Sequence, residues 1–265
     1  MTYQATPTLA ATSRWRVQGV SVQGYSHLRD GIECQDAYRH MYVESAGAHV
    51  LAVSDGAGSR ARSAEGATLA VGLATSLLSE RLGSGGAPRS ADGFRSLLSG
   101  TYTEIVSAFL NATERMGPDR GEFAATLTAV ILAAPWAGVM SLGDGFVITR
   151  TADFQGREGF HLVSFADGAG EYVNETVFLT SVRALEQMRV DCVYDPDLTA
   201  VVLGTDGLIP AAIRQQGARK RVNRSFLEPL LGVLDDPAGI ARFLLEDRIS
   251  ALSADDKTLL VAVGT

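Results

Sequence analysis

Four apolar segments of this chain meet an aspartate at one end, and three of these aspartates are followed directly by glycine. Asp55, Asp144 and Asp206 each follow an apolar run, and Asp255 stands shortly before the run 259–263. A strand that ends at Asp-Gly directs a carboxylate beyond its sheet, and the glycine lets the backbone turn sharply. Several such ends at one rim would gather carboxylates that repel one another unless cations lie between them. The pattern therefore favours a sheet-based fold and predicts a site for divalent metal ions.

A single Asp-Gly pair carries little information, because it is among the commonest turn dipeptides. Asp92-Gly93 and Asp167-Gly168 lie in polar stretches and are interpreted as ordinary turns. The other pairs differ in the apolar run before each of them, and the Asp255-Asp256 pair adds to the set. On the pattern alone, a shared metal site and a set of unrelated turns remain equally open.

Composition narrows the class of protein and the class of metal. The formal charge is −7, from 23 basic and 30 acidic residues, which argues against nucleic acid or an anionic membrane as partner. Two cysteines and four scattered histidines give neither a disulfide framework nor a zinc pattern, so oxygen ligands for Mg²⁺ or Mn²⁺ are expected. No apolar run is long enough to span a membrane, and residues 1–13 do not resemble a signal peptide. We therefore expect a cytoplasmic protein.

Apolar periodicity predicts an α+β fold with antiparallel sheets covered by helices on their outer faces. Helical spacing covers residues 63–82, 94–116, 207–215, 226–234 and 237–252. Strands are expected at residues 15–25, 36–43, 49–54, 124–133, 138–142, 146–149, 160–165, 189–194, 200–205 and 259–264. No linker divides the chain, so we expect a disordered or loosely attached segment 1–14 and a single domain over residues 15–265.

Six short motifs occur in a defined order along the chain. They are Cys34-Gln35-Asp36, Ser54-Asp55-Gly56-Ala57-Gly58, Ala125-Thr126-Leu127, Gly143-Asp144-Gly145, Thr205-Asp206-Gly207 and Asp255-Asp256-Lys257-Thr258. Together they resemble the bacterial metal-dependent Ser/Thr protein phosphatases of the 2C type, over about residues 18–264. The stretch 170–176 also resembles a segment of one bacterial branch. The resemblance implies two antiparallel β-sheets packed as a sandwich with helices on both outer faces, and a catalytic role for the domain.

The resemblance also implies a metal-dependent reaction and the residues that serve it. Asp55 would bridge two Mn²⁺ or Mg²⁺ ions, Gly56 would help bind one through its carbonyl oxygen, and Asp206 and Asp255 would hold the other. Asp36 would orient a metal-bound water. A hydroxide between the two ions would attack the phosphorus of phosphoserine or phosphothreonine in proteins, while the ions neutralise the developing charge.

The resemblance implies two further metal ligands, and the sequence around them departs from the family pattern. Gln35 stands where many members have Glu, so it would be a neutral ligand to the second ion. Asp144, together with Asp206, would bind the third ion found in some bacterial members. The aspartate that often follows four residues after Asp206 is Pro210 here, so two ions are expected and a third remains open.

The family's phosphate-binding arginine and general-acid histidine are both missing from their usual places, which hold Gly31 and Ala57. Arg29 is the nearest guanidinium and is predicted to bind the substrate phosphate. The leaving oxygen would be protonated by metal-bound water or by His27, and His27 is predicted to assist its departure. A solvated loop position for both side chains is the alternative interpretation.

Phosphorylated proteins and a cognate Ser/Thr kinase are the expected partners of a monomeric, signalling enzyme. Two other functions remain open from the sequence. One is a catalytically weak or inactive module that keeps the fold and binds a protein partner. The other is a phosphatase for a small phosphorylated molecule.

Overall fold

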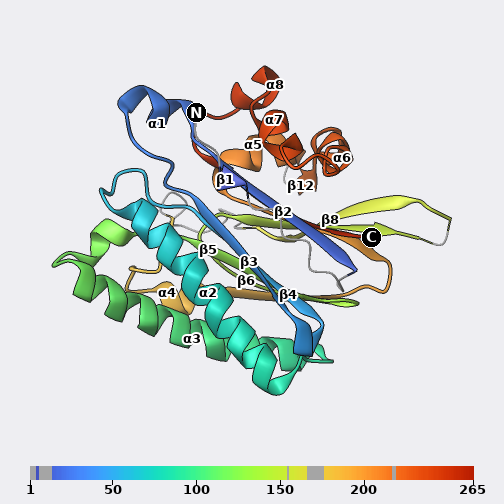
Figure 1. The fold of residues 1–265 in the computed structure, drawn as a ribbon, viewed down its shortest axis with the longest axis horizontal. Coiled ribbons are helices and arrows are strands. Elements are labelled where there is room, and N and C mark those ends of the chain that lie inside the picture. Colours follow the sequence, from blue (N-terminus) through green and yellow to red (C-terminus); the bar gives the residue numbers. More distant parts are fainter. Residues whose placement is uncertain (1–3, 6–13, 154, 166–175, 217–218) are drawn as a thin grey trace.

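Two antiparallel β-sheets pack face to face in the computed structural model of this chain (Figure 1). The structure describes residues 4–5, 14–153, 155–165, 176–216 and 219–265. One sheet has the order β1 (Gln4–Ala5), β2 (Trp15–Val22), β13 (Lys257–Gly264), β10 (Leu198–Gly204), β7 (Phe146–Ala152) and β8 (Glu158–Ser164). The other has the order β3 (Ala37–Val43), β4 (Ala48–Ser54), β5 (Leu127–Ala133), β6 (Trp136–Leu142) and β9 (Arg189–Tyr194).

Helices cover both outer faces of the sandwich, so the predicted fold class is confirmed (Figure 1). The five-stranded sheet is covered by α2 (Ser63–Gly85) and α3 (Ala91–Met116), with α4 (Ala184–Gln187) nearby. The six-stranded sheet is covered by α5 (Ile209–Ala212), α6 (Arg224–Gly232), α7 (Gly239–Leu244) and α8 (Asp247–Ser250). The remaining short elements are α1 (Tyr25–Asp30), the hairpin β11 (Ile213–Gln216) and β12 (Arg219–Val222), and the 3₁₀ helices η1 (Glu44–Ala46), η2 (Arg120–Phe123) and η3 (Asp206–Leu208). None of the helices within the described ranges combines the length and apolar character of a membrane span.

The central strands are buried on both faces, which explains their uninterrupted apolar runs. In β4, Val50 and Ala52 pack in the core under α2 and α3, whereas Leu51 and Val53 pack against the other sheet. Successive side chains of a strand point to opposite faces, so a strand between two apolar layers needs apolar residues throughout. A third core joins the six-stranded sheet to the C-terminal helices. Three apolar layers thus stabilise the sandwich. Because these layers lie along the middle of the strands, polar groups can occupy the strand ends.

Three predicted elements differ from the structure. The strand expected over residues 15–25 ends at Val22, and α1 follows. The helix expected over 207–215 ends at Ala212, because the next residues pair with β12 to form the hairpin. The helix expected over 237–252 is divided into α7 and α8 by the extended conformation of Glu246. In the hairpin, strand pairing overrides the local helical preference of residues 213–216.

The expected N-terminal segment, residues 1–14, lies largely outside the described residues. Within it, the two-residue strand β1 pairs antiparallel with β2. Most of the polar stretch 166–176, including Asp167-Gly168, also lies outside them.

Candidate metal centre

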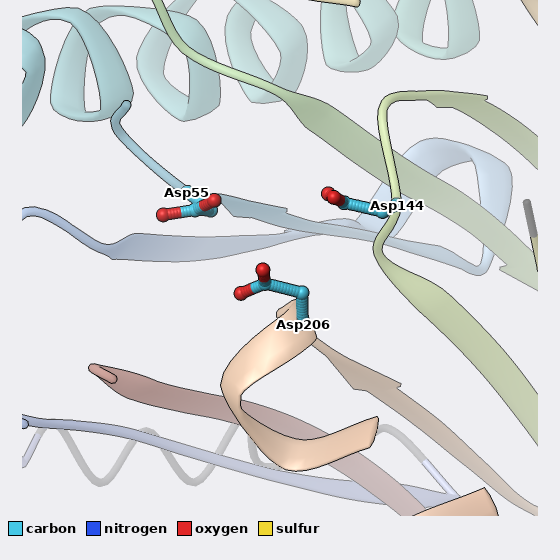
Figure 2. Close-up of side chains that lie close together, drawn as sticks. All are labelled: Asp55, Asp144 and Asp206. Carbon is cyan, nitrogen blue, oxygen red and sulfur yellow. The ribbon is translucent and has the colours of Figure 1, made fainter. Parts of the chain in front are cut away.

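Three aspartates from separate strand ends converge at one rim of the sandwich (Figure 2). Asp55 follows β4, Asp144 lies in the turn between β6 and β7, and Asp206 opens η3 directly after β10. One carboxylate oxygen of each residue lies within 4.8 Å of the others. Figure 2 shows the three side chains directed toward a common centre. The two sheets therefore bring together three of the carboxylates singled out from the sequence.

The backbone around Asp55 is held by hydrogen bonds from two neighbouring segments. The Asp55 amide donates to the Thr126 hydroxyl at 2.9 Å, and the Thr126 amide donates back to the Asp55 carbonyl at 2.8 Å. The next residue, Gly56, donates its amide to the Gln35 carbonyl at 3.1 Å. A Cβ on Gly56 would lie 2.7 Å from that carbonyl oxygen, so only glycine permits this approach. The motif sequence thus fixes the direction in which the Asp55 carboxylate leaves the strand.

Asp36 is buried just before β3 and is held from the other sheet. Its carboxylate accepts the Thr205 hydroxyl at 2.7 Å, and the same hydroxyl oxygen accepts the Thr258 amide at 3.0 Å. Burial raises the pKa of Asp36, and the charge of Asp256 raises it further against the lowering effect of the Thr205 hydrogen bond. Asp36 is therefore a positioned carboxylate next to the ends of β10 and β13.

Electrostatic strain is concentrated at the carboxylate cluster. Burial, followed by the charges of Asp36 and Asp206, raises the pKa of Asp55 far above its usual range. Burial also raises the pKa of Asp206, and the charges of Asp144 and Asp255 add to the effect. Like charges at this separation disfavour joint ionisation unless a cation lies among them. The three carboxylates are therefore unfavourable as free ionised groups, and they are suitable ligands for a hard divalent cation.

Two buried oxygen atoms at the site support the same conclusion. Asp144 Oδ1 and Gln35 Oε1 are buried and have no hydrogen-bond partner among the described residues. The other carboxylate oxygen of Asp144 accepts the Thr176 hydroxyl at 2.8 Å, so the side chain is already held in place. Buried acceptors without donors are costly, and a metal ion is the partner that suits carboxylate and amide oxygens. The residues present therefore fit a divalent metal ion.

Asp255 and Asp256 take opposite directions, and only one of them was singled out from the sequence as a site residue. Asp255 is exposed, lies outside the group of three converging carboxylates, and accepts the Asp256 amide at 2.9 Å. It is near enough for its charge to raise the pKa of Asp206. A Cβ on Gly207 would lie 1.9 Å from the Asp256 carbonyl oxygen. This close approach brings the segment carrying the acidic pair against the loop of Asp206.

Asp256 binds three donors inside the protein and orients His27. It accepts the amides of Gly24 and Gln35, both at 2.6 Å, and lies 2.9 Å from Nδ1 of His27. The other ring nitrogen, Nε2, forms no hydrogen bond to the described part of the chain. A Cβ placed on Gly58 would lie 3.8 Å from Nε2, so the ring faces the loop that follows Asp55. Strand alternation could not have identified Asp256, because Lys257 and Thr258 lie on opposite faces of β13 and both are buried.

Arg29 points to a different side of α1 from His27. It lies on α1 two residues after His27, and residues two apart face different sides of a helix. Its guanidinium pairs with Asp30 through two contacts of 2.8 Å, and its side chain is 63% exposed. Gly31 ends the helix with φ +69°, a conformation that disfavours an arginine at that position. The local backbone thus turns His27 inward and Arg29 outward.

Comparison with known proteins shows similarity over nearly the whole chain. A family model described as Protein phosphatase 2C matches residues 23–247. Serine/threonine-protein phosphatase 3 of Escherichia coli (strain K12) is 27% identical over 259 residues, which cover 94% of this chain and 98% of that protein.

Solved structures share the fold at low sequence identity. A serine-threonine phosphatase 2C from Toxoplasma gondii has a TM-score of 0.64 and 13% identity, covering 100% of this chain and 99% of its own. The serine/threonine phosphatase PstP/Ppp of Mycobacterium tuberculosis has a TM-score of 0.61 and 17% identity, covering 94% and 98%. The family match spans most of the chain and the carboxylates converge at one rim. The chain therefore belongs to the protein phosphatase 2C family and is a phosphoprotein phosphatase.

Proposed function

We propose that this enzyme hydrolyses phosphoserine and phosphothreonine in proteins with two Mn²⁺ or Mg²⁺ ions at the cluster. The convergence of three carboxylates within 4.8 Å carries this proposal. Asp55 would contact both ions, helped by the Gly56 carbonyl. Asp206 and Asp255 would hold one of them. When bound, the ions supply a hydroxide nucleophile and neutralise charge developing on the phosphoryl group.

The remaining polar residues at the rim have supporting roles in this proposal. Asp36, fixed by the Thr205 hydroxyl, would accept a hydrogen bond from the attacking water and so orient it. Gln35 would offer its buried amide oxygen, which lacks a donor among the described residues. Asp144 would hold a third ion with Asp206, since its inner oxygen is also without a donor there.

His27 is proposed as the general acid. Its Nδ1 donates to the Asp256 carboxylate, which fixes the ring orientation and turns Nε2 toward the site. Nε2 carries a proton as well when the ring is the imidazolium, which is the form that acts as the acid. As the phosphorus–oxygen bond breaks, the bonding electrons pass to the leaving oxygen and Nε2 would donate its proton there. Arg29 is paired with Asp30, so its predicted contact with phosphate requires that ion pair to open.

The proposed substrate class and partners follow the similarity to named phosphatases. The Escherichia coli relative is a serine/threonine-protein phosphatase, which supports phosphoproteins as substrates and a Ser/Thr kinase as the opposing enzyme. A cytoplasmic monomer, with one catalytic domain over residues 15–265, remains part of the proposal.

The decisive experiment is hydrolysis of a phosphothreonine peptide by wild type and the Asp55→Asn protein, with Mn²⁺ and with EDTA. The proposal predicts turnover that needs the metal and falls by at least about 10² in the variant, the scale of one lost electrostatic stabiliser. Undiminished turnover in EDTA would refute the metal mechanism. Absence of turnover with intact metal binding would instead favour the inactive binding module.

A further inference from the structure

The hairpin formed by β11 and β12 carries three arginines on one exposed face. Arg214 pairs directly with Arg221 in the antiparallel register, and directly paired residues share a face. Arg219 lies two residues before Arg221 and therefore shares that face as well. All three are exposed. The opposite face is turned to the protein, where Ile213 and Val222 pack against the core under the C-terminal helices.

None of the three guanidinium groups has an acidic partner among the residues that the structure describes. No ion pair to any of them occurs in the described ranges, although neighbouring Arg224 pairs with Glu228 at 2.8 Å. Like charges placed directly opposite each other destabilise a strand pair. The arrangement occurs on a protein with a formal charge of −7, so a cluster of positive charge is not what its overall charge would predict. An external anion would relieve the repulsion between the facing arginines.

The beginning of β12 lies toward the metal centre. Lys220 lies 3.9 Å from the centroid of the Phe165 ring, whereas Arg224 stacks over Phe160 at the middle of β8. Phe165 directly follows Ser164, which pairs with Val147. β12 therefore runs along β8 away from the Asp144 turn, and its first residue lies nearest to that turn. Figure 1 shows β12 grouped with α5 and α6 over the six-stranded sheet.

The distance from the cluster suits a peptide that extends out of the active site. Val147 is three residues after Asp144, or about 10 Å along a strand. The beginning of β12 is reached from there across the neighbouring strand β8. An extended peptide advances about 3.3 Å per residue. Residues roughly four to six positions from the phosphorylated one would therefore reach the arginine face.

We propose that the face formed by Arg214, Arg219 and Arg221 binds an acidic segment of the phosphoprotein substrate, a few residues from the phosphorylated side chain. This inference rests on the proposed function, because it specifies the class of substrate for the same active site. Carboxylates suit the face, since guanidinium groups bind them with paired hydrogen bonds. A small phosphorylated molecule would not reach the hairpin, so the face favours a protein substrate.

The test compares two phosphothreonine peptides that differ only at positions four to six on either side, with Glu in one and Gln in the other. The variant is Arg219→Gln/Arg221→Gln. The matched control is Arg89→Gln/Arg120→Gln, which removes two exposed arginines without ion pairs in the described chain. Both variants change the formal charge from −7 to −9, since each loses two positive charges. Long-range effects of net charge are therefore equal in the two proteins.

With Mn²⁺ present, the hairpin variant should raise KM for the Glu peptide about tenfold, roughly threefold for each exposed charge contact. Its kcat, and its KM for the Gln peptide, should change less than about twofold. The control should behave as wild type, and about 0.5 M salt should remove the difference by screening. Equal KM values for both peptides in wild type, or an equal effect in the control, would overturn the inference.

Two further measurements separate this inference from the proposed function. Failure of wild type to hydrolyse p-nitrophenyl phosphate with Mn²⁺ would count against the proposed function. Normal turnover of that compound without a preference for the Glu peptide would count against the docking face alone. Fluorescence anisotropy of both labelled peptides on the Asp55→Asn protein measures docking without turnover. Equal affinity for the two peptides there would also overturn the inference.

Discussion

Replacing Asp256 with alanine should destabilise the protein strongly, although Asp256 is not among the proposed metal ligands. Its side chain is 2% exposed and accepts two backbone amides, at 2.6 Å each, and the His27 ring at 2.9 Å. These contacts join Gly24 before α1, the loop of Gln35 and the start of β13. One carboxylate thus connects two N-terminal segments to a strand more than 220 residues later in the sequence.

The expected loss in the free energy of unfolding is about 3–6 kcal/mol. Removing the carboxylate leaves three donors without an acceptor, and each buried, unsatisfied group costs about 1–3 kcal/mol. Water entering the space left by the side chain would keep the sum toward the lower end. Asp256→Asn retains the shape and one acceptor but faces an amide NH₂ toward a donor, so about half of this loss is expected.

Urea unfolding in EDTA measures this loss without a contribution from bound metal. Asp235→Ala is the matched control, because Asp235 is 90% exposed and, among the described residues, pairs with Arg16 alone. It should cost less than about 1 kcal/mol. An Asp256→Ala protein within about 1 kcal/mol of wild type would refute the reasoning. Activity provides a second readout. If Asp256 acts through His27, the double variant Asp256→Asn/His27→Ala should lose no more kcat on alkyl phosphates than His27→Ala alone.

Three further outcomes are expected. His27→Ala should lower kcat for alkyl phosphates more than for aryl phosphates, whose leaving oxygen needs no proton; equal losses would contradict the general-acid role. Arg29→Ala should raise KM less than about twofold, because its guanidinium is exposed and paired with Asp30; a tenfold rise would show that the pair opens to bind phosphate. In metal-free protein, burial and then the charges of Asp144 and Asp255 raise the pKa of Asp206 to about 7, against about 3.9 when unfolded. The folded state therefore retains a proton that the unfolded chain releases, so unfolding free energy should fall from about pH 4 to about pH 7. Bound Mn²⁺ should abolish this decrease in the free energy of unfolding. A decrease of the same size in the Asp206→Asn protein would show that other groups cause it.

The sandwich and its main carboxylates were predictable because strand ends are visible in the sequence. The runs before Asp55, Asp144 and Asp206 are long and apolar, and each stops at a turn residue. Antiparallel strands stacked in two sheets then bring these ends to one rim. Buried strands carry the strongest local pattern in this chain, so the fold was predicted correctly, and three of the predicted site carboxylates lie together.

Short elements and side-chain directions were less predictable. The six-residue helix α1 and the four-residue strands of the hairpin are too short for a periodic pattern, and the hairpin strands carry Arg and Gln rather than typical strand residues. Their form depends on tertiary contacts. In Asp255-Asp256, neighbouring carboxylates face opposite sides of the chain, and motif order does not show which one is buried. The direction of Arg29 likewise depends on a helix that the sequence pattern does not indicate.

Mn²⁺ binding measured by isothermal titration calorimetry tests the central claim most directly, because it reports on the cluster without requiring a substrate. Wild type should bind at least two ions. Asp55→Asn should lose a site or weaken binding at least about tenfold. Asp92→Asn, which alters an exposed Asp-Gly pair on α3, should bind as wild type does. Equal binding by wild type and the Asp55→Asn protein would contradict the assignment of the metal centre to this cluster.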